Sequence, residues 1–89
     1  MSYRVLLHPK AAEFLKKCSA ETSRRISRRL GELGDKPEKN GERLRHSSFW
    51  RLRIGDYRAI YTIDEEKREV IVLFIGHRRD VYDDFTRLF

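Results

Sequence analysis

Cysteine is nearly missing from this sequence, and its scarcity excludes several classes of protein. Cys18 stands alone, so the chain can form neither an internal disulfide nor a thiolate metal site, and we expect a packed core thiol. The three histidines lack the spacing of metal ligands, so we expect neither a metal nor another cofactor.

Long apolar runs are missing as well. No stretch approaches the roughly 20 apolar residues that are needed to cross a bilayer. His8 and Pro9 interrupt the first apolar run too soon for a signal peptide. We therefore expect a cytoplasmic protein without a membrane partner.

Acidic residues are outnumbered by basic ones. The sequence has 20 Lys and Arg, fourteen of them Arg, against 14 Asp and Glu, which gives a net charge of +6. Residues 1–60 hold 15 basic and 7 acidic side chains, a net +8, whereas residues 61–89 hold 5 and 7, a net −2. Localised positive charge favours an anionic partner such as nucleic acid. A solvated charged surface is the alternative.

The hydrophobic pattern predicts one small α+β domain over residues 1–89. A chain of this length is too short for two cores. The predicted elements are a strand at 3–7, helices at about 9–18 and 20–33, strands at about 49–54, 57–63 and 69–76, and a terminal helix with Asp80 as its N-cap. This β-α-α-β-β-β-α order predicts a largely antiparallel four-stranded sheet, an N-terminal helical hairpin on one face and a short C-terminal helix. Residues 35–48 have turn chemistry and no period, so we expect them to connect rather than pack.

The stretch 50–58 alternates apolar and cationic residues and reverses at a Gly-Asp pair. Glycine in the first position of a two-residue turn favours type II′ geometry, which places Arg53 opposite Arg58. Alternation along the strand adds Arg51 to the same face of the sheet. The other face receives the apolar residues Trp50, Leu52, Ile54, Tyr57, Ala59 and Tyr61.

Placing arginines opposite each other destabilises a hairpin by some tenths of a kcal/mol, so folding alone gives little reason for it. Guanidinium groups are planar forks of donors that suit phosphate oxygens and stay charged at physiological pH. Arg51, Arg53 and Arg58 therefore predict a phosphate site. The alternative is that they pair with acidic residues of the connector or the tail.

Two further basic segments flank this hairpin. The second helix carries Arg24, Arg25, Arg28 and Arg29 opposite its apolar stripe. This ridge is either a solvated face or a surface for RNA or for an acidic partner. The stretch Gly76-His77-Arg78-Arg79-Asp80-Val81-Tyr82 follows the apolar strand 69–76. Tyr82 lies one position off the apolar stripe of the last helix, so it either stacks on an RNA base or is a half-buried tyrosine with a solvated hydroxyl.

The chain resembles the RelE branch of the RelE/ParE toxin superfamily. The resemblance rests on the order of the predicted elements, on Leu44-Arg45 and on residues 50–61 and 75–82. The resemblance covers essentially the whole chain. It implies the toxin of a type II toxin–antitoxin system, an endoribonuclease that cuts mRNA in the ribosomal A site and is neutralised by an acidic, RelB-like antitoxin. The implied partners are mRNA, ribosomal RNA and that antitoxin, which the ridge on the second helix would bind.

Roles also follow by position from the resemblance. Arg51 and Arg53 occupy the place of basic residues on the first hairpin strand, Arg58 that of a phosphate-binding arginine, Arg78 that of a leaving-group arginine and Tyr82 that of a base-stacking tyrosine. Arg45, His77 and Arg79 are expected to contact RNA. The implied reaction is attack by a ribose 2′-hydroxyl on the adjacent phosphate, which leaves a 2′,3′-cyclic phosphate and needs no metal.

The best-known members carry lysines where this chain has Arg51 and Arg53, and arginine does not deprotonate in proteins. A conventional general base is therefore missing. His77, His46, Asp80 or a ribosomal RNA group could serve, or stabilisation by arginine alone suffices at a reduced rate, which we favour for Arg53. A ParE-like gyrase inhibitor and a non-catalytic RNA-binding module are the alternative functions.

Overall fold

In a computed structural model that describes residues 2–89, the chain folds into nine short elements. They are β1 (Arg4–Leu7), α1 (Pro9–Lys17), α2 (Ala20–Glu32), α3 (Pro37–Asn40), β2 (Glu42–Arg43), β3 (Trp50–Ile54), β4 (Tyr57–Asp64), β5 (Glu69–His77) and α4 (Val81–Leu88). The α+β class predicted from the sequence is confirmed. No helix in this part of the chain has the length and apolar character to cross a membrane.

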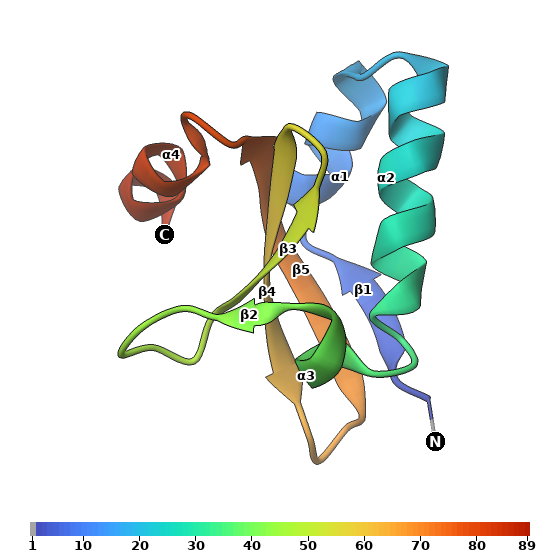
Figure 1. Cartoon of the computed structure of the whole chain (residues 1–89), viewed down its shortest axis with the longest axis vertical. Coiled ribbons are helices and arrows are strands. Elements are labelled where there is room, and N and C mark those ends of the chain that lie inside the picture. Colours follow the sequence, from blue (N-terminus) through green and yellow to red (C-terminus); the bar gives the residue numbers. More distant parts are fainter. Residues whose placement is uncertain (1) are drawn as a thin grey trace.

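The five strands form one sheet in the order β1-β5-β4-β3-β2, with β1 parallel to β5 and the other pairs antiparallel (Figure 1). β5 lies between β1 and β4, as its unbroken apolar pattern predicted for a central strand. The predicted number of four strands is wrong, because Glu42 and Arg43 pair with Arg51 and Trp50 and add β2 at the edge. A strand of two residues is too short to show a period in the sequence.

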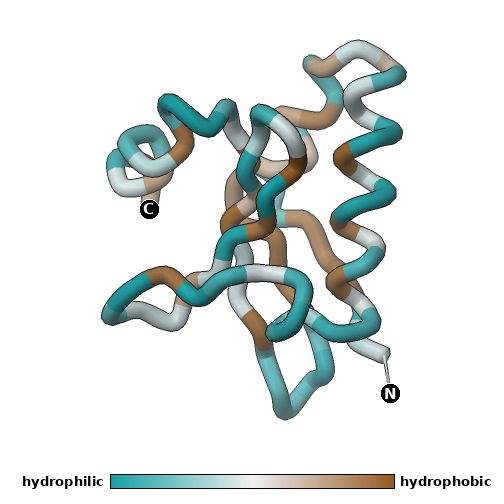
Figure 2. Tube along the Cα trace, in the orientation of Figure 1, coloured by the Kyte–Doolittle hydropathy of each residue, from teal (hydrophilic) through white to brown (hydrophobic). Residues whose placement is uncertain are grey.

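The main core lies between the sheet and the helical hairpin of α1 and α2, which stands on one side of the sheet (Figure 1). Ser19 caps α2 as predicted, because its Oγ accepts a hydrogen bond from the backbone N–H of Thr22. Ile26 and Leu30 of α2 and its C-cap residue Leu33 form a stripe that is buried in the main core. Figure 2 shows apolar positions along the side of α2 that faces the sheet. Burial of this stripe fixes how α2 lies along β3.

The opposite face of the sheet is covered only in part, by α4. Val81 and Phe85 of α4 pack on Ile60 of β4, and the partly buried Tyr82 borders this smaller cluster. Asp80 precedes α4 as predicted, although its side chain makes no capping hydrogen bond. The hairpin arginines lie on the rest of this face, where Arg53 is exposed, Arg51 is half-buried and Arg58 is buried.

The connector 35–48 packs against the sheet, so the expectation that it merely connects is wrong. The hydroxyl of Tyr61 donates a hydrogen bond to the carbonyl of Pro37, 2.6 Å away, and both residues are buried. Asn40 Nδ2 donates to the carbonyl of Glu32 at 3.1 Å, which ties α3 to the end of α2. A side chain at Gly41 would run into the Tyr61 hydroxyl and lie 2.7 Å from the Arg51 carbonyl oxygen. Backbone contacts of this kind leave no periodic signature in a sequence.

Tyr61→Phe should show how much the hydrogen bond from Tyr61 to Pro37 contributes to the stability of the protein. The variant leaves the buried carbonyl of Pro37 without a donor, which should cost about 1–2 kcal/mol of the free energy of unfolding at pH 8. Burial raises the pKa of Tyr61 to about 12, so the wild type also loses stability as the pH rises from about 10 to about 12, because the unfolded chain releases this proton first.

The variant has no phenol to titrate, so urea unfolding at pH 11 should show a gap between the two proteins about 1 kcal/mol smaller than at pH 8. An equal gap at both pH values would contradict the buried, hydrogen-bonded state of Tyr61.

Candidate functional site

The hairpin of β3 and β4 places its arginines as the sequence predicted. Arg53 lies opposite Arg58, and the paired strands put Arg51 on the same face. Gly55 has a φ of 59°, whereas Asp56 is not among the described residues with positive φ, which is the type II′ pattern. We call the surface formed by Arg51, Arg53 and Arg58, on the side of the sheet that faces away from α1 and α2, the arginine face.

Arg58 is buried and its charge is directed at the hairpin backbone. Its Nη1 donates hydrogen bonds of 2.8 Å to the carbonyls of Gly55 and Tyr57. These carbonyl dipoles stabilise the guanidinium beside Arg53, whose side chain is exposed. Among the described residues, none accepts a hydrogen bond from Nη2 or Nε of Arg58. Two donor positions of a fixed guanidinium thus remain for an anion.

Arg51 is the central member of a chain of side chains that joins three elements. Its Nη1 donates to the hydroxyl of Tyr82 on α4 at 2.8 Å, and its Nη2 donates to Oε2 of Glu42 on β2 at 2.9 Å. The Arg51 hydrogen bond holds the pKa of the Glu42 carboxyl below its usual value, and the nearby charges of Arg53 and Arg58 lower it further. The hydrogen bonds to Tyr82 and then to Glu42 raise the pKa of Arg51. Pairing with an acid of the connector, the alternative left open by the sequence, is therefore realised for Arg51.

Arg78 lies at the hairpin end of the arginine face. Its backbone N–H donates to the carbonyl of Asp56 at 2.8 Å, and its Nε lies 3.9 Å from Asp56 Oδ1. Arg58 is paired across the sheet with Gly76, two residues before Arg78. The hairpin turn and the end of β5 thus bring Arg78 close to Arg58, while its side chain stays largely exposed.

The residues proposed as a base from the sequence do not gather on this face. His77 is paired with Tyr57, and the two rings meet edge to face with centroids 6.0 Å apart, on the side of the sheet covered by α1. Its Nδ1 accepts a hydrogen bond from the backbone N–H of the exposed Arg79 at 3.2 Å. Asp80 is exposed before α4, and His46 is exposed on the connector. The geometry favours none of these three as a base at the arginine face.

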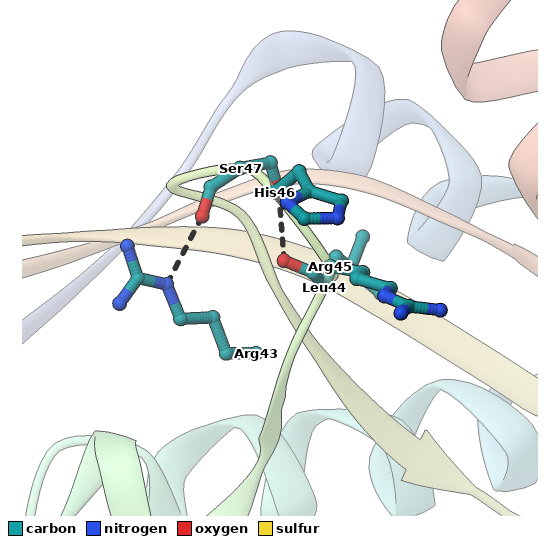
Figure 3. A pocket seen from close by; sticks show the side chains of 5 residues that line it. All are labelled: Arg43, Leu44, Arg45, His46 and Ser47. Atoms are coloured by element: carbon teal, nitrogen blue, oxygen red, sulfur yellow. Dashed lines mark hydrogen bonds between the residues drawn. The ribbon is translucent and has the colours of Figure 1, made fainter.

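Arg45 lies on the loop between β2 and β3, where residues 43–47 line an open hollow of about 570 Å³ (Figure 3). The loop is held from within, because Arg43 Nε donates to the Ser47 carbonyl at 3.0 Å and Ser47 Oγ donates to the Leu44 carbonyl at 3.1 Å. Figure 3 shows Arg43 and Arg45 pointing away from each other. Arg45 is exposed and is free to meet a ligand above the loop.

The basic ridge on α2 divides into two parts. Arg24, Arg25 and Arg28 are exposed. Arg29 forms an ion pair with Glu32, and its Nη2 donates to the backbone carbonyl of Arg53 at 3.0 Å. Arg29 therefore covers the edge of β3 beyond the short β2 strand, and sequence periodicity could not show this contact.

The site as a whole is an arginine-rich surface with one carboxylate and one phenol. Within residues 2–89, no group of three His, Cys, Asp or Glu side chains converges on a metal position. Glu42, which pairs with Arg51, is the residue of this site that sequence reasoning missed, because it belongs to β2, an element that was not predicted. A single acidic residue among the basic Lys39, Arg43 and Arg45 was the signal that could have drawn attention to it.

Comparison with known proteins assigns this architecture to a class. A family model described as the ParE toxin of the type II toxin–antitoxin system parDE matches residues 5–82. The protein therefore belongs to the RelE/ParE superfamily of type II toxins, as its sequence motifs indicated. The individual proteins that it resembles are RelE-type toxins, which confirms the predicted RelE branch.

Toxin RelG of Mycobacterium tuberculosis is 37% identical over 55 residues, which cover 60% of this chain and 63% of that toxin. The toxin–antitoxin complex RelBE2 of the same organism contains a chain with a TM-score of 0.81 and 28% identity, over 88% of this chain and 100% of that one. The archaeal RelE–RelB complex of Pyrococcus horikoshii gives a TM-score of 0.74 and 27% identity, over 88% and 97% of the two chains.

Gly55→Ala should destabilise the hairpin that positions the arginine face. Its φ of 59° is unfavourable for a residue with a Cβ, so the variant should lose about 1–2 kcal/mol of the free energy of unfolding. Gly31→Ala is the matched control. A Cβ at Gly31 meets nothing within 4 Å in α2, so this change should stabilise the protein by up to about 1 kcal/mol. Chemical denaturation of both variants tests the turn, and equal effects would contradict its geometry.

Proposed function

We propose that this toxin is a ribosome-dependent endoribonuclease that cleaves mRNA in the ribosomal A site. The observation that carries the proposal is the convergence of Arg51, Arg58 and Arg78 with Tyr82 on one open face, from β3, β4 and α4 and the end of β5. Each of these residues also occupies the position that the resemblance assigns to a role in RNA cleavage. The predicted roles of these four residues and of Arg53 remain part of this proposal.

The reaction we propose is attack of a ribose 2′-hydroxyl on the neighbouring phosphorus. A new bond forms between the 2′-oxygen and phosphorus, the bond to the 5′-oxygen breaks, and the products are a 2′,3′-cyclic phosphate and a 5′-hydroxyl. Negative charge grows on the phosphoryl oxygens in the transition state, where the fixed donors of Arg58 stabilise it more than they stabilise the substrate. Arg78, beside the hairpin turn, would stabilise charge on the departing 5′-oxygen, which takes up a proton from solvent water to become the 5′-hydroxyl.

In this proposal Glu42 is the general base that was not identified from the sequence. Its carboxylate is ionised at neutral pH, but Arg51 lowers its pKa and so weakens it as a proton acceptor while the two are paired. Release from Arg51 would remove that effect and let the carboxylate accept a proton from the 2′-hydroxyl. Arg51 would turn from Glu42 to the phosphate as RNA binds, and this exchange would release the carboxylate. Tyr82, freed from Arg51, would then offer its ring to a base.

The same class membership leads us to propose a cognate antitoxin. The compared structures from Mycobacterium tuberculosis and Pyrococcus horikoshii contain toxin–antitoxin complexes. For this chain, the exposed Arg24, Arg25 and Arg28 on α2 form a basic surface that suits an acidic partner. The loop residue Arg45 and the tail residue Arg79 remain proposed contacts to mRNA or ribosomal RNA.

Arg78→Ala should abolish most cleavage without unfolding the protein, because the side chain is largely exposed. Loss of one donor to the transition state should slow cleavage by about 10²-fold. The measurement is a map of mRNA 5′ ends in a translating extract, where the wild type should give codon-phased cuts. Arg87→Ala removes another largely exposed arginine, from the last turn of α4, and should cut like the wild type.

An unchanged pattern of 5′ ends with the wild type would overturn the nuclease proposal. The family model that matches is described as a ParE toxin, which keeps a gyrase poison as the second candidate. A linear DNA band trapped with gyrase in the presence of the wild type would support that candidate instead.

Glu42→Gln separates the roles of binding and proton transfer. The variant keeps the size of the side chain but removes the acceptor charge, so cleavage should fall by about 10²-fold. Removing a negative charge from the arginine face should leave RNA binding as tight or tighter. Single-turnover cleavage on programmed ribosomes, with binding measured separately, gives both values. Undiminished cleavage would exclude Glu42 as the base.

A further inference from the structure

A second cationic recess lies beside the arginine face, on the edge of the sheet. It has a volume of about 270 Å³, and its lining includes Arg29, Lys39, Asn40, Glu42, Arg51 and Arg53. Four of these side chains are cationic and one, Glu42, is acidic, so the lining side chains carry a net charge of +3 (four minus one). The recess is therefore strongly positive and adjoins the proposed site of cleavage through Arg51 and Arg53.

The cations of this recess are held in place by neighbouring elements. Arg29 is anchored by Glu32 and by the backbone carbonyl of Arg53, so its guanidinium lies against the edge of β3 and not in open solvent. Arg29 is thus preorganised for a ligand, which lowers the entropic cost of binding one.

Lys39 reaches the recess because α3 is fixed. Asn40 donates hydrogen bonds to the carbonyls of Glu32 and Lys36, and Tyr61 donates to Pro37 at the start of α3. Lys39 itself is exposed and forms no ion pair among the described residues. An unpaired lysine next to a fixed arginine is a pattern that suits phosphate oxygens.

We propose that this recess is a second phosphate-binding site, in which Arg29, Lys39 and Arg53 hold a phosphodiester of the RNA next to the one that is cleaved. Arg51 and Arg53 are two residues apart on β3, so they lie about 6–7 Å apart along the strand. This spacing lets a single strand of RNA pass from the arginine face to the recess. The proposal rests on the proposed function for the identity of the ligand, and it moves Arg29 from the antitoxin surface to the RNA site.

The test is binding of a fluorescent 2′-O-methyl RNA hexanucleotide, which has no 2′-hydroxyl and cannot be cleaved, measured by anisotropy between 0.05 and 1 M NaCl. Lys39→Ala removes one phosphate contact, so the slope of log affinity against log salt should fall by about 0.7 and the affinity at 0.05 M should drop about eightfold. Lys39→Arg should restore the binding. Lys16→Ala, an exposed lysine on α1 that does not line the recess, is the charge-matched control and should bind like the wild type.

Equal binding by Lys39→Ala and Lys16→Ala would overturn the second site, and so would an absence of measurable binding by the wild type at 0.05 M salt. If Lys39→Ala weakened only the complex with an acidic antitoxin peptide, the recess would belong to a protein partner and the proposal would be wrong. Neither ribosome nor cleavage enters this assay. A wild type that fails to cut mRNA but shows the Lys39 effect would overturn the proposed nuclease and leave the recess as an RNA site.

Discussion

The two-residue turn at Gly55 and Asp56 sets the register on which the arginine face depends. A side chain projects to alternate faces along a strand, so a slip of one residue would move Arg53 and Arg58 into the core and carry apolar side chains out to solvent. The positive φ of Gly55 excludes that slip, and the carbonyls of the same turn accept the hydrogen bonds of Arg58. The backbone carbonyl of Asp56 also accepts a hydrogen bond from the backbone N–H of Arg78. One turn therefore determines the hairpin and positions both Arg58 and Arg78.

The connector gives the face its remaining features. α3 and β2 lie beside β3 because the buried Tyr61 hydroxyl holds Pro37 and because Gly41 allows close approach. This arrangement presents Glu42 to Arg51 on one side and Lys39 to the edge of the sheet on the other. A segment with no hydrophobic period thus brings a carboxylate and a cation to a surface that otherwise consists of arginine and aromatic groups.

The sequence predicted the parts of the fold that depend on local pattern. The helices, the three long strands, the Ser19 cap and the pairing of Arg53 with Arg58 follow from periodicity and turn chemistry, and each is present. The edge strand β2 and the helix α3 depend on single hydrogen bonds and on the packing of Gly41, so no sequence pattern predicted them. His77 is the opposite case, because the sequence suggested it as a site residue and the structure places it elsewhere. The two residues that follow it are arginines, yet its place in β5 turns its ring to the helix-covered face beside Tyr57.

The bonds of Arg51 to Tyr82 and Glu42 have a consequence for ligand discrimination. The two terminal nitrogens of Arg51 already have internal partners, so an anion that approaches this arginine competes with a phenol and a carboxylate that are present at a high, fixed local concentration. A lone phosphate gains little by displacing them, since it replaces one set of hydrogen bonds with another. A polymer that also engages Arg58, and that offers a base to the released tyrosine ring, gains several contacts from the same displacement. If the proposed RNA site is correct, these internal partners would disfavour small anions relative to a nucleic-acid strand.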